Sequence, residues 1–444
     1  MDGTVGARRT LEIAIAALLV GTTAALPLIF VPGLDDGYAL PKAVLLRLAG
    51  IAIAVSFVLY LLVGGSLIGR RERWIDPALA VFVGLVAIST ALSVDVRQSV
   101  IGEPYQYQGV VTVLLYVGAF YAARLVLRSP ERFRALAMTH VLVGGVVAAY
   151  AIAQTLGFDP FWSGPPEDRA ISSVGQANDL AAYLDLVIAF AIGQWGVSGR
   201  RARALIGVVV VLSIIGLGLT LSRGGFLALF GIGVLMVAFV GRTSGARRWL
   251  SRRIVVSAAI AVVASFLVAT PLLSPVIARL GTTSDLQEGS IRMHLDSWRV
   301  GLAIAADHPL FGTGPETFPL VFADYLDGIL PPERAANLRR FRLESPHDEW
   351  IGIAAESGIP ALLAYLVVLG AIGIRFARRA MLAGGPWNVI AVTALAVVLT
   401  HVIANAFKTP DTSTSLLFWI AVGSGLAASD PGGRTGSGDH RSSF

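Results

Sequence analysis

The chain has 444 residues, of which 55% are hydrophobic and only 14% are charged. Because a soluble globular protein has about 25% charged residues, this composition excludes that class and predicts an all-α polytopic membrane protein. The formal net charge of +6 does not indicate a nucleic-acid partner, since most basic residues fall in short clusters between apolar runs. Cysteine is absent, which excludes disulfide and thiolate chemistry.

Apolar runs long enough to cross a bilayer predict about twelve membrane-spanning helices. The first run follows Arg8 and Arg9 and is longer than the apolar core of a signal peptide, so we expect it to be retained. The predicted spans are residues 11–31, 43–64, 78–93, 108–127, 134–156, 180–196, 203–221, 224–240, 254–273, 349–374, 387–407 and 412–428.

One long polar interruption organises the chain. We expect N-terminal spans at 1–273, a long loop with short helices at 274–348, C-terminal spans at 349–428 and a disordered tail at 429–444, all in one membrane domain. Most Lys and Arg residues fall in alternate connections between spans. Because cytoplasmic loops carry an excess of Lys and Arg, this alternation predicts cytoplasmic termini and a long loop on the outer side.

Few basic residues lie on the expected outer side outside the long loop. Lys42 precedes the second span and is either an interfacial lysine whose stem lies along the apolar surface or a ligand-binding group. Arg223 lies in the tight hairpin at 222–225, close to hydrocarbon, where a charge costs about 2.5–3.5 kcal/mol. It should pair with an acidic loop residue or bind an anionic headgroup. The complete set is Lys42, Arg47, Arg97, Arg169, Arg223 and Lys408.

Two other outer loops carry polar groups. Residues 93–109 are rich in tyrosine and amide side chains, which suit sugar hydroxyls but are equally typical of an interfacial aromatic belt. Asn178 and Asp179 precede an apolar run, and their short side chains favour helix capping over a place in a cavity.

In the long loop, Arg292, Asp296 and Arg299 are spaced by four and three residues, which predicts an amphipathic helix with an exposed Arg292–Asp296 pair. The Gly312-Thr313-Gly314 sequence predicts only a turn.

The last part of the loop carries candidate acid–base groups. Glu349 and Glu356 are seven residues apart and would share one face of a helix. His294, His308 and His347 lack a recognisable metal-ligand spacing, so we predict no metal. His140 and His401, on apolar spans, are expected to be packing residues.

Several short motifs follow one another on the expected outer side. They are Leu40-Pro41-Lys42, 175–181, Ser222-Arg223-Gly224-Gly225, Arg292 with Trp298, His308 to Gly314, Pro346-His347 and Glu356-Ser357-Gly358. Their order resembles the O-antigen ligase and polymerase superfamily of bacterial membrane glycosyltransferases. Two of the motifs differ from the family pattern: Asp348 stands where an asparagine is usual, and Gln176-Ala177-Asn178-Asp179 replaces a paired-asparagine form.

The resemblance implies a GT-C-like multi-pass enzyme of the bacterial cytoplasmic membrane with its active site on the outer side. Such an enzyme moves a glycan from undecaprenyl diphosphate to an acceptor hydroxyl of a lipid A-core-type glycolipid or another surface glycan. It works without a metal or cofactor. A surface-polysaccharide polymerase differs only in its acceptor and is an alternative. A secondary transporter is a less favoured alternative, because no internal repeat is apparent.

The resemblance and the chemistry together give each candidate residue a role. A histidine can take the proton of an alcohol near neutral pH, so His347 is the expected base. Guanidinium groups bind a diphosphate leaving group with paired hydrogen bonds. The expected donor-binding residues are Arg223, Arg292 and Lys42, and the expected orienting or substrate-binding residues are Asp348, Glu349, Glu356 and Asn178.

Overall fold

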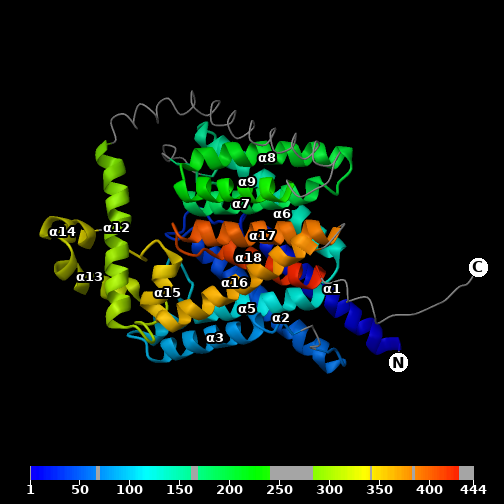
Figure 1. The fold of residues 1–444 in the computed structure, drawn as a ribbon, viewed down its shortest axis with the longest axis horizontal. Helices are drawn as coiled ribbons and strands as arrows, with labels where there is room; N and C mark the ends of the chain where they lie inside the picture. The colour runs from blue at the N-terminus through cyan, green and yellow to red at the C-terminus, as the bar shows by residue number, and fades with distance from the viewer. Residues whose placement is uncertain are drawn as a thin grey trace, which may run out of the picture.

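The computed structural model describes residues 2–66, 71–161, 169–240, 284–340, 343–382 and 386–429, and all regular structure in these ranges is α-helical. The all-helical prediction is therefore confirmed for this part of the chain. Most helices lie side by side in one bundle (Figure 1). These are α1 (Asp2–Ala25), α2 (Ala39–Leu62), α3 (Ile75–Ala91), α5 (Val110–Val126), α6 (Pro130–Thr155), α7 (Ala177–Trp195), α8 (Arg200–Thr220), α9 (Arg223–Val240), α16 (Ile359–Leu382), α17 (Pro386–Asn405) and α18 (Thr412–Ala428).

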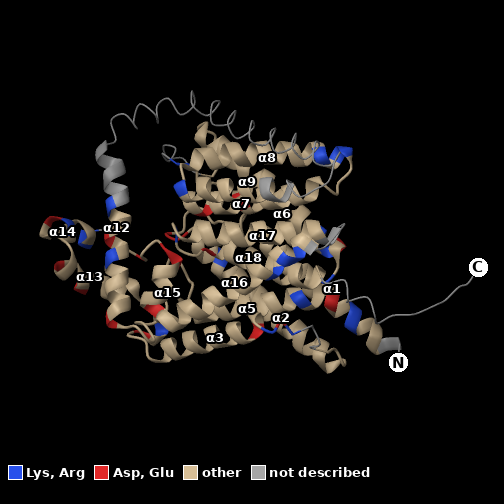
Figure 2. Ribbon diagram, in the orientation of Figure 1, with Lys and Arg blue, Asp and Glu red and all other residues tan. Residues whose placement is uncertain are grey.

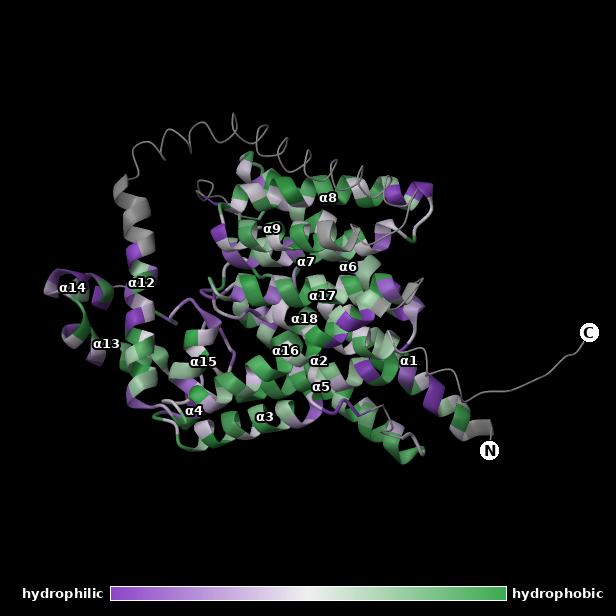
Figure 3. Ribbon diagram, in the orientation of Figure 1, coloured by the Kyte–Doolittle hydropathy of each residue, from purple (hydrophilic) through white to green (hydrophobic). Residues whose placement is uncertain are grey.

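Five described helices, α2, α6, α8, α16 and α17, are long and apolar enough to cross a membrane, and α3, α5, α9 and α18 contain shorter apolar stretches. The hydropathy colouring shows apolar helix bodies with polar segments gathered at their ends (Figure 3). This pattern identifies a membrane protein with several spans. The total of about twelve spans stays a prediction, and the span expected at 254–273 lies outside the described residues.

The face of α2 that points away from the bundle shows why these helices suit lipid. Leu48, Ile51, Val55 and Val58 are all more than half exposed, and their spacing of three and four residues places them on one face. In water such an apolar stripe would require a covering partner. In a bilayer, acyl chains cover it.

One end of the bundle carries the polar segments of the long loop. Helix α12 (Ser284–Asp307) runs crosswise over this end, and the shorter helices gather beside it (Figure 1). We call this the α12 end. The shorter helices are α4 (Val96–Ile101), α13 (Phe318–Ile329), α14 (Pro332–Arg340) and α15 (Glu349–Ser357).

The opposite end carries the start of α1 and the end of α18 (Figure 1). Basic residues concentrate there as well as on α12 and α14 (Figure 2). Arg200 begins α8, and Arg124 and Arg379 lie in the last turns of α5 and α16. A cytoplasmic location for this end remains an expectation from the charge bias.

The span predicted at 349–374 is wrong in one respect, because the helix is interrupted at Gly358. This residue has φ +89°, and a Cβ atom there would lie 2.3 Å from the Leu310 carbonyl oxygen. Only glycine tolerates both the left-handed backbone and this approach. As a result α15 is a separate short helix packed against α12, and the membrane span begins at Ile359.

Candidate functional site

His347 lies in the loop before α15 and is held in an unusual backbone conformation. Its φ is +55°, a left-handed value that costs a non-glycine residue about 1–3 kcal/mol and is often found at functional sites. Two local hydrogen bonds fix the loop: the His347 amide donates to Ser345 Oγ (3.1 Å), and the Ile351 amide donates to Asp348 Oδ1 (2.9 Å). Asp348 therefore caps α15 and sets the position of the neighbouring histidine.

The imidazole of His347 packs edge-to-face on that of His294 in α12, with ring centroids 5.4 Å apart. Burial, with a further contribution from His294, lowers the pKa of His347 to about 4. The ring is therefore neutral at pH 7 and can accept a proton. No side chain in the described ranges forms a hydrogen bond with this ring, which leaves its nitrogens available to a ligand.

Two arginines act on this histidine pair. Burial is the main cause of the lowered pKa of His294, and the charges of Arg169 and Arg223 lower it further, so both guanidinium groups lie within electrostatic reach. Arg169 is fixed by donating to Asn178 Oδ1 (2.8 Å) and to the Thr220 carbonyl (2.7 Å). Arg223 begins α9 and is exposed, with no ion pair to any described residue.

This arrangement corrects the capping prediction for the start of α7. Gln176 occupies the N-cap position and makes no side-chain cap. Asn178 instead accepts from Arg169, and Asp179 forms an ion pair with Lys408. Both side chains face the α12 end of the bundle through these contacts rather than binding the amides of their own helix.

The predicted Arg292–Asp296 pair is replaced by other partners. Asp296 is buried and pairs with Arg299 of its own helix and with Arg334 of α14, both at 3.0 Å. These contacts tie α14 to α12. The side chain of Arg292 is exposed on the same helix, two residues before His294.

Lys408 is the centre of a buried ion cluster that the sequence reasoning did not assign to the site. Its ammonium lies 3.0 Å from Asp179 of α7 and 2.7 Å from Asp411. Burial alone would lower the pKa of Lys408, but the two carboxylates outweigh it and raise the pKa above the ordinary value. The lysine therefore stays charged and joins α7 to the α17–α18 connection.

Replacing Lys408 with methionine is expected to destabilise the protein by about 3–5 kcal/mol, because it leaves two carboxylates without their cation. Thermal unfolding in detergent would measure the loss. A second variant combining Lys408→Met with Asp179→Asn and Asp411→Asn removes all three charges and should recover much of the stability. Equal destabilisation in the triple variant would show that lysine packing, not charge pairing, is responsible.

Lys42 is also buried, and its ammonium donates to the Ser173 carbonyl (3.1 Å) and to the Val174 carbonyl. The lysine at the start of α2 thereby holds the turn that leads into α7. The interfacial alternative, with the ammonium directed to water, does not describe this residue.

A cavity of about 300 Å³, here called the His347 cavity, opens beside these residues. Its wall combines carboxylates with tyrosine, amide and threonine side chains. The carboxylates are Asp35, Asp36, Asp179, Glu344 and Asp411, and the other polar lining residues include Lys42, Tyr38, Tyr105, Gln106 and Gln176.

Glu349 and Glu356 line a second, smaller cavity of about 120 Å³, here called the glutamate cavity. Glu349 accepts from Asn405 (2.6 Å) and Tyr365 (3.2 Å), and Glu356 accepts from the Phe318 amide (3.0 Å). Burial raises the pKa of each glutamate to about 7. Neither carboxylate forms a hydrogen bond with His347.

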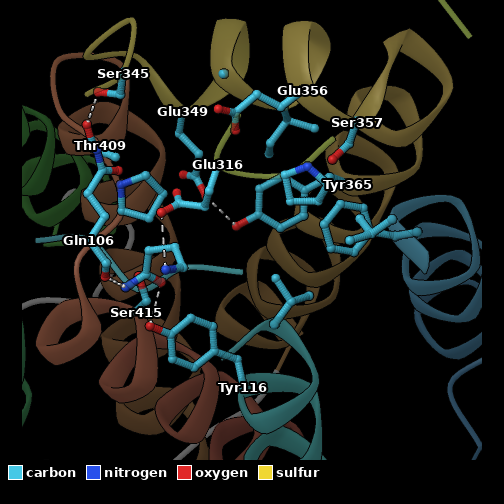
Figure 4. Close-up of a pocket in the computed structure, with 18 of the residues that line it drawn as sticks. Gln106, Tyr116, Glu316, Ser345, Glu349, Glu356, Ser357, Tyr365, Thr409 and Ser415 are labelled. Atoms are coloured by element: carbon cyan, nitrogen blue, oxygen red, sulfur yellow. Dashed lines mark hydrogen bonds between the residues drawn. The ribbon is translucent and has the colours of Figure 1, made fainter. Parts of the chain in front are cut away.

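Figure 4 shows Glu316 and Glu349 directed into the same space from different segments. Glu316 accepts from the backbone amides of Glu103 (3.1 Å) and Gln108 (3.3 Å), so it ties the long loop to the loop at 102–109. Gln106, in that loop, lines both cavities. His401, expected to be a packing residue, also lines the glutamate cavity, and its Nε2 lies 2.9 Å from the Tyr365 hydroxyl.

The Gly312-Thr313-Gly314 turn is structural. The amides of Thr313 and Gly314 donate to the carbonyls of Ala355 (3.1 Å) and Glu356 (2.8 Å). Gly312 has φ +65°, and a Cβ atom there would lie 2.2 Å from the Glu356 carbonyl carbon. The turn therefore locks the end of α12 onto α15, which places His294 beside His347.

The described ranges contain no cluster of three or more His, Cys, Asp or Glu side chains arranged to hold a metal ion. His308 is exposed and lines a different cavity from His347, so the three histidines of the long loop do not converge. Metal independence remains a prediction.

Sequence reasoning missed Arg169 and Lys408 as site residues, although both belong to the small set of basic residues on the expected outer side. That charge bias was a usable signal, because Lys42, Arg169, Arg223 and Lys408 all lie around the site. Glu316 gave no such signal, since its role depends on backbone amides of a distant loop.

Residues 208–366 match the family model described as O-antigen ligase. The match begins in α8, includes Arg223, Arg292 and His347, and ends in α16. No curated protein matches the chain.

Proposed function

Because residues 208–366 match the family model described as O-antigen ligase, we propose that the protein is an O-antigen ligase-like glycosyltransferase. It transfers a glycan from undecaprenyl diphosphate to an acceptor hydroxyl on the outer face of the bacterial cytoplasmic membrane. The observation that carries this proposal is a neutral histidine, His347, packed on His294 at the polar end of a membrane bundle, where the charges of Arg169 and Arg223 act on His294.

In the proposed reaction, the acceptor hydroxyl donates its proton to His347 as its oxygen attacks the anomeric carbon. A new carbon–oxygen bond forms while the bond to the diphosphate breaks, and the bonding electrons pass to the diphosphate oxygen. A single displacement of this kind inverts the anomeric centre. Guanidinium groups stabilise the charge that develops on the leaving group.

We assign donor binding to Arg223 and Arg292. We add Arg169 because its guanidinium group lies within electrostatic reach of His294. Arg169 is held by Asn178, which makes Asn178 a positioning residue for the clamp. Lys42 supports the same region by holding the turn before α7. Asp348 positions His347 by capping α15, and Glu349 and Glu356 build the adjoining cavity.

A polymerase is the second candidate, because the same catalytic groups serve either acceptor and the family match is compatible with both. The protein should be assayed in lipid nanodiscs with an undecaprenyl-diphosphate-linked oligosaccharide, in the presence of a chelator. Release of undecaprenyl diphosphate only with a lipid A-core glycolipid supports a ligase, and release with a second donor glycan supports a polymerase. Movement of a small solute without donor consumption would instead support a transporter.

The pH dependence should report the lowered pKa of His347. Since the base must be deprotonated, kcat/KM should fall as pH drops through about 4, rather than through the ordinary histidine pKa of 6.5. The bound diphosphate is anionic and favours the imidazolium, so kcat should fall at a higher pH than kcat/KM.

The control for this pH profile is the neighbouring ring. His294→Asn removes one cause of the lowered pKa of His347 and should move the acidic limb of the kcat/KM profile to higher pH. His308→Asn should leave this limb at the same pH. An acidic limb at 6.5 in the unsubstituted protein would contradict the assignment of His347 as a buried base.

A further inference from the structure

His347 is near two surroundings of opposite charge. Its partner ring His294 experiences the positive charges of Arg169 and Arg223. His347 itself lines a cavity whose wall contains five carboxylates, those of Asp35, Asp36, Asp179, Glu344 and Asp411. A diphosphate and an acceptor would therefore find very different electrostatic environments, one near His294 and the other in the cavity.

We infer that the His347 cavity is the acceptor subsite. It binds a glycan terminus that is either uncharged or carries an amine, and it excludes a terminus with a negative charge. This inference rests on the proposed function and specifies its acceptor. An inverting displacement requires the acceptor and the leaving group to lie on opposite sides of the anomeric carbon. The diphosphate then belongs on the arginine side and the acceptor in the cavity.

The cationic groups near the cavity are already engaged within the protein. Lys408 pairs with Asp179 and Asp411, and the ammonium of Lys42 donates to backbone carbonyls. Asp35 is exposed at the cavity rim and forms no ion pair with a described residue. With Asp179 and Asp411 paired to Lys408, the carboxylates of Asp35, Asp36 and Glu344 still outnumber the Lys42 ammonium in the wall, so a phosphate or carboxylate on the acceptor would be repelled.

Both the carboxylates and the aromatic rings of the wall suit a sugar. Carboxylates act only as hydrogen-bond acceptors, which matches the hydroxyl donors of a glycan. Tyr38 and Tyr105 line the same cavity and offer apolar ring surface, and Tyr105 is 51% exposed. A cavity of about 300 Å³ is at the lower end of the range for ligand sites, which suits a glycan terminus rather than a long segment.

A bound cation is the competing explanation for an acid-rich wall. Within the described ranges, however, no three of these side chains converge as metal ligands. The carboxylates instead come from the segments 35–36, 179, 344 and 411, around a space that His347 also lines. Such a distribution favours several separate hydrogen bonds along an extended ligand.

The test uses the purified full chain in nanodiscs and three acceptor oligosaccharides that differ only in the terminal sugar: glucose, glucosamine or glucuronic acid. We expect kcat/KM to be about tenfold or more lower for the glucuronic acid acceptor than for the other two. Binding of the same oligosaccharides without donor, measured by saturation-transfer NMR, should show the same preference.

Removing cavity charge should relax this preference. In the Asp35→Asn/Glu344→Gln variant, the ratio of kcat/KM between the glucose and glucuronic acid acceptors should approach one, with an unchanged KM for the donor. Asp324→Asn, at an exposed position of α13 that does not line the cavity, should keep the original ratio. A loss of fold would lower all rates together and would not change the ratio.

Equal or better use of the glucuronic acid acceptor would overturn the inference and leave the transfer reaction intact. An unchanged ratio in the double variant would also overturn it. If no donor is consumed with any acceptor, the proposed function fails, and the donor-free binding preference still decides whether the cavity takes glycans without negative charge.

Discussion

Replacing His347 with alanine is expected to reduce glycan transfer by about 10²–10⁴-fold, because the acceptor hydroxyl loses the group that takes its proton. Donor binding should persist, since the arginines that bind the diphosphate are unchanged. Release of undecaprenyl diphosphate gives the rate, and fluorescence competition with a labelled donor gives the affinity.

His308→Ala is the matched control for the His347 variant. His308 lies in the same long loop but is exposed and lines another cavity, so its removal should leave the rate near that of the unsubstituted protein. Near-normal turnover by His347→Ala would remove this histidine from the mechanism. A lost donor affinity would instead assign it a binding role.

Replacing Arg223 with alanine is expected to lower kcat by about 10²–10³-fold, the usual effect of removing one group that stabilises developing charge. Arg223 is exposed and has no ion-pair partner within the described ranges, so the substitution removes no described internal ion pair. Arg223→Lys should recover only part of the rate, because an ammonium cannot make the paired hydrogen bonds of a guanidinium.

The control is Arg200→Ala. Arg200 is exposed and begins α8, whereas Thr220, which binds Arg169, lies at the other end of this helix. Transfer should be unaffected there. Single-turnover measurements separate chemistry from donor binding. If Arg223→Ala changes only the KM for the donor, its guanidinium binds the ground state and does not assist bond cleavage.

The class of fold was accessible from the sequence because hydropathy and charge report directly on the solvent around each helix. Basic residues on the expected outer side were also informative, since Lys42, Arg169, Arg223 and Lys408 all lie around the site. In the expected topology each would oppose the usual charge bias, which predicts a specific local role for each residue.

The partners of these residues could not be predicted. Asp179 meets Lys408 because α7 packs against α17, and hydropathy does not tell which spans are neighbours. Asp296 pairs with Arg334 rather than Arg292 because α14 folds back onto α12. Helical spacing describes only one helix at a time.

The interrupted helix at Gly358 was missed for a different reason. A hydropathy window sees an apolar run from 349 to 374 and does not register one residue with a left-handed backbone. The Leu310 carbonyl, whose close approach requires glycine at position 358, lies just after α12 and is distant in sequence. No local pattern encodes this contact.

The contacts of Lys42 bear on how genetic screens of such a protein should be interpreted. Because its ammonium holds the carbonyls of Ser173 and Val174, a Lys42→Ala clone would score as inactive whenever the turn before α7 collapses. The phenotype would resemble that of a lost donor contact, although its cause would be the collapsed turn. A complementation assay alone would therefore assign Lys42 to substrate recognition, and only a parallel measurement of protein abundance in the membrane would separate a misfolded allele from a catalytically impaired one.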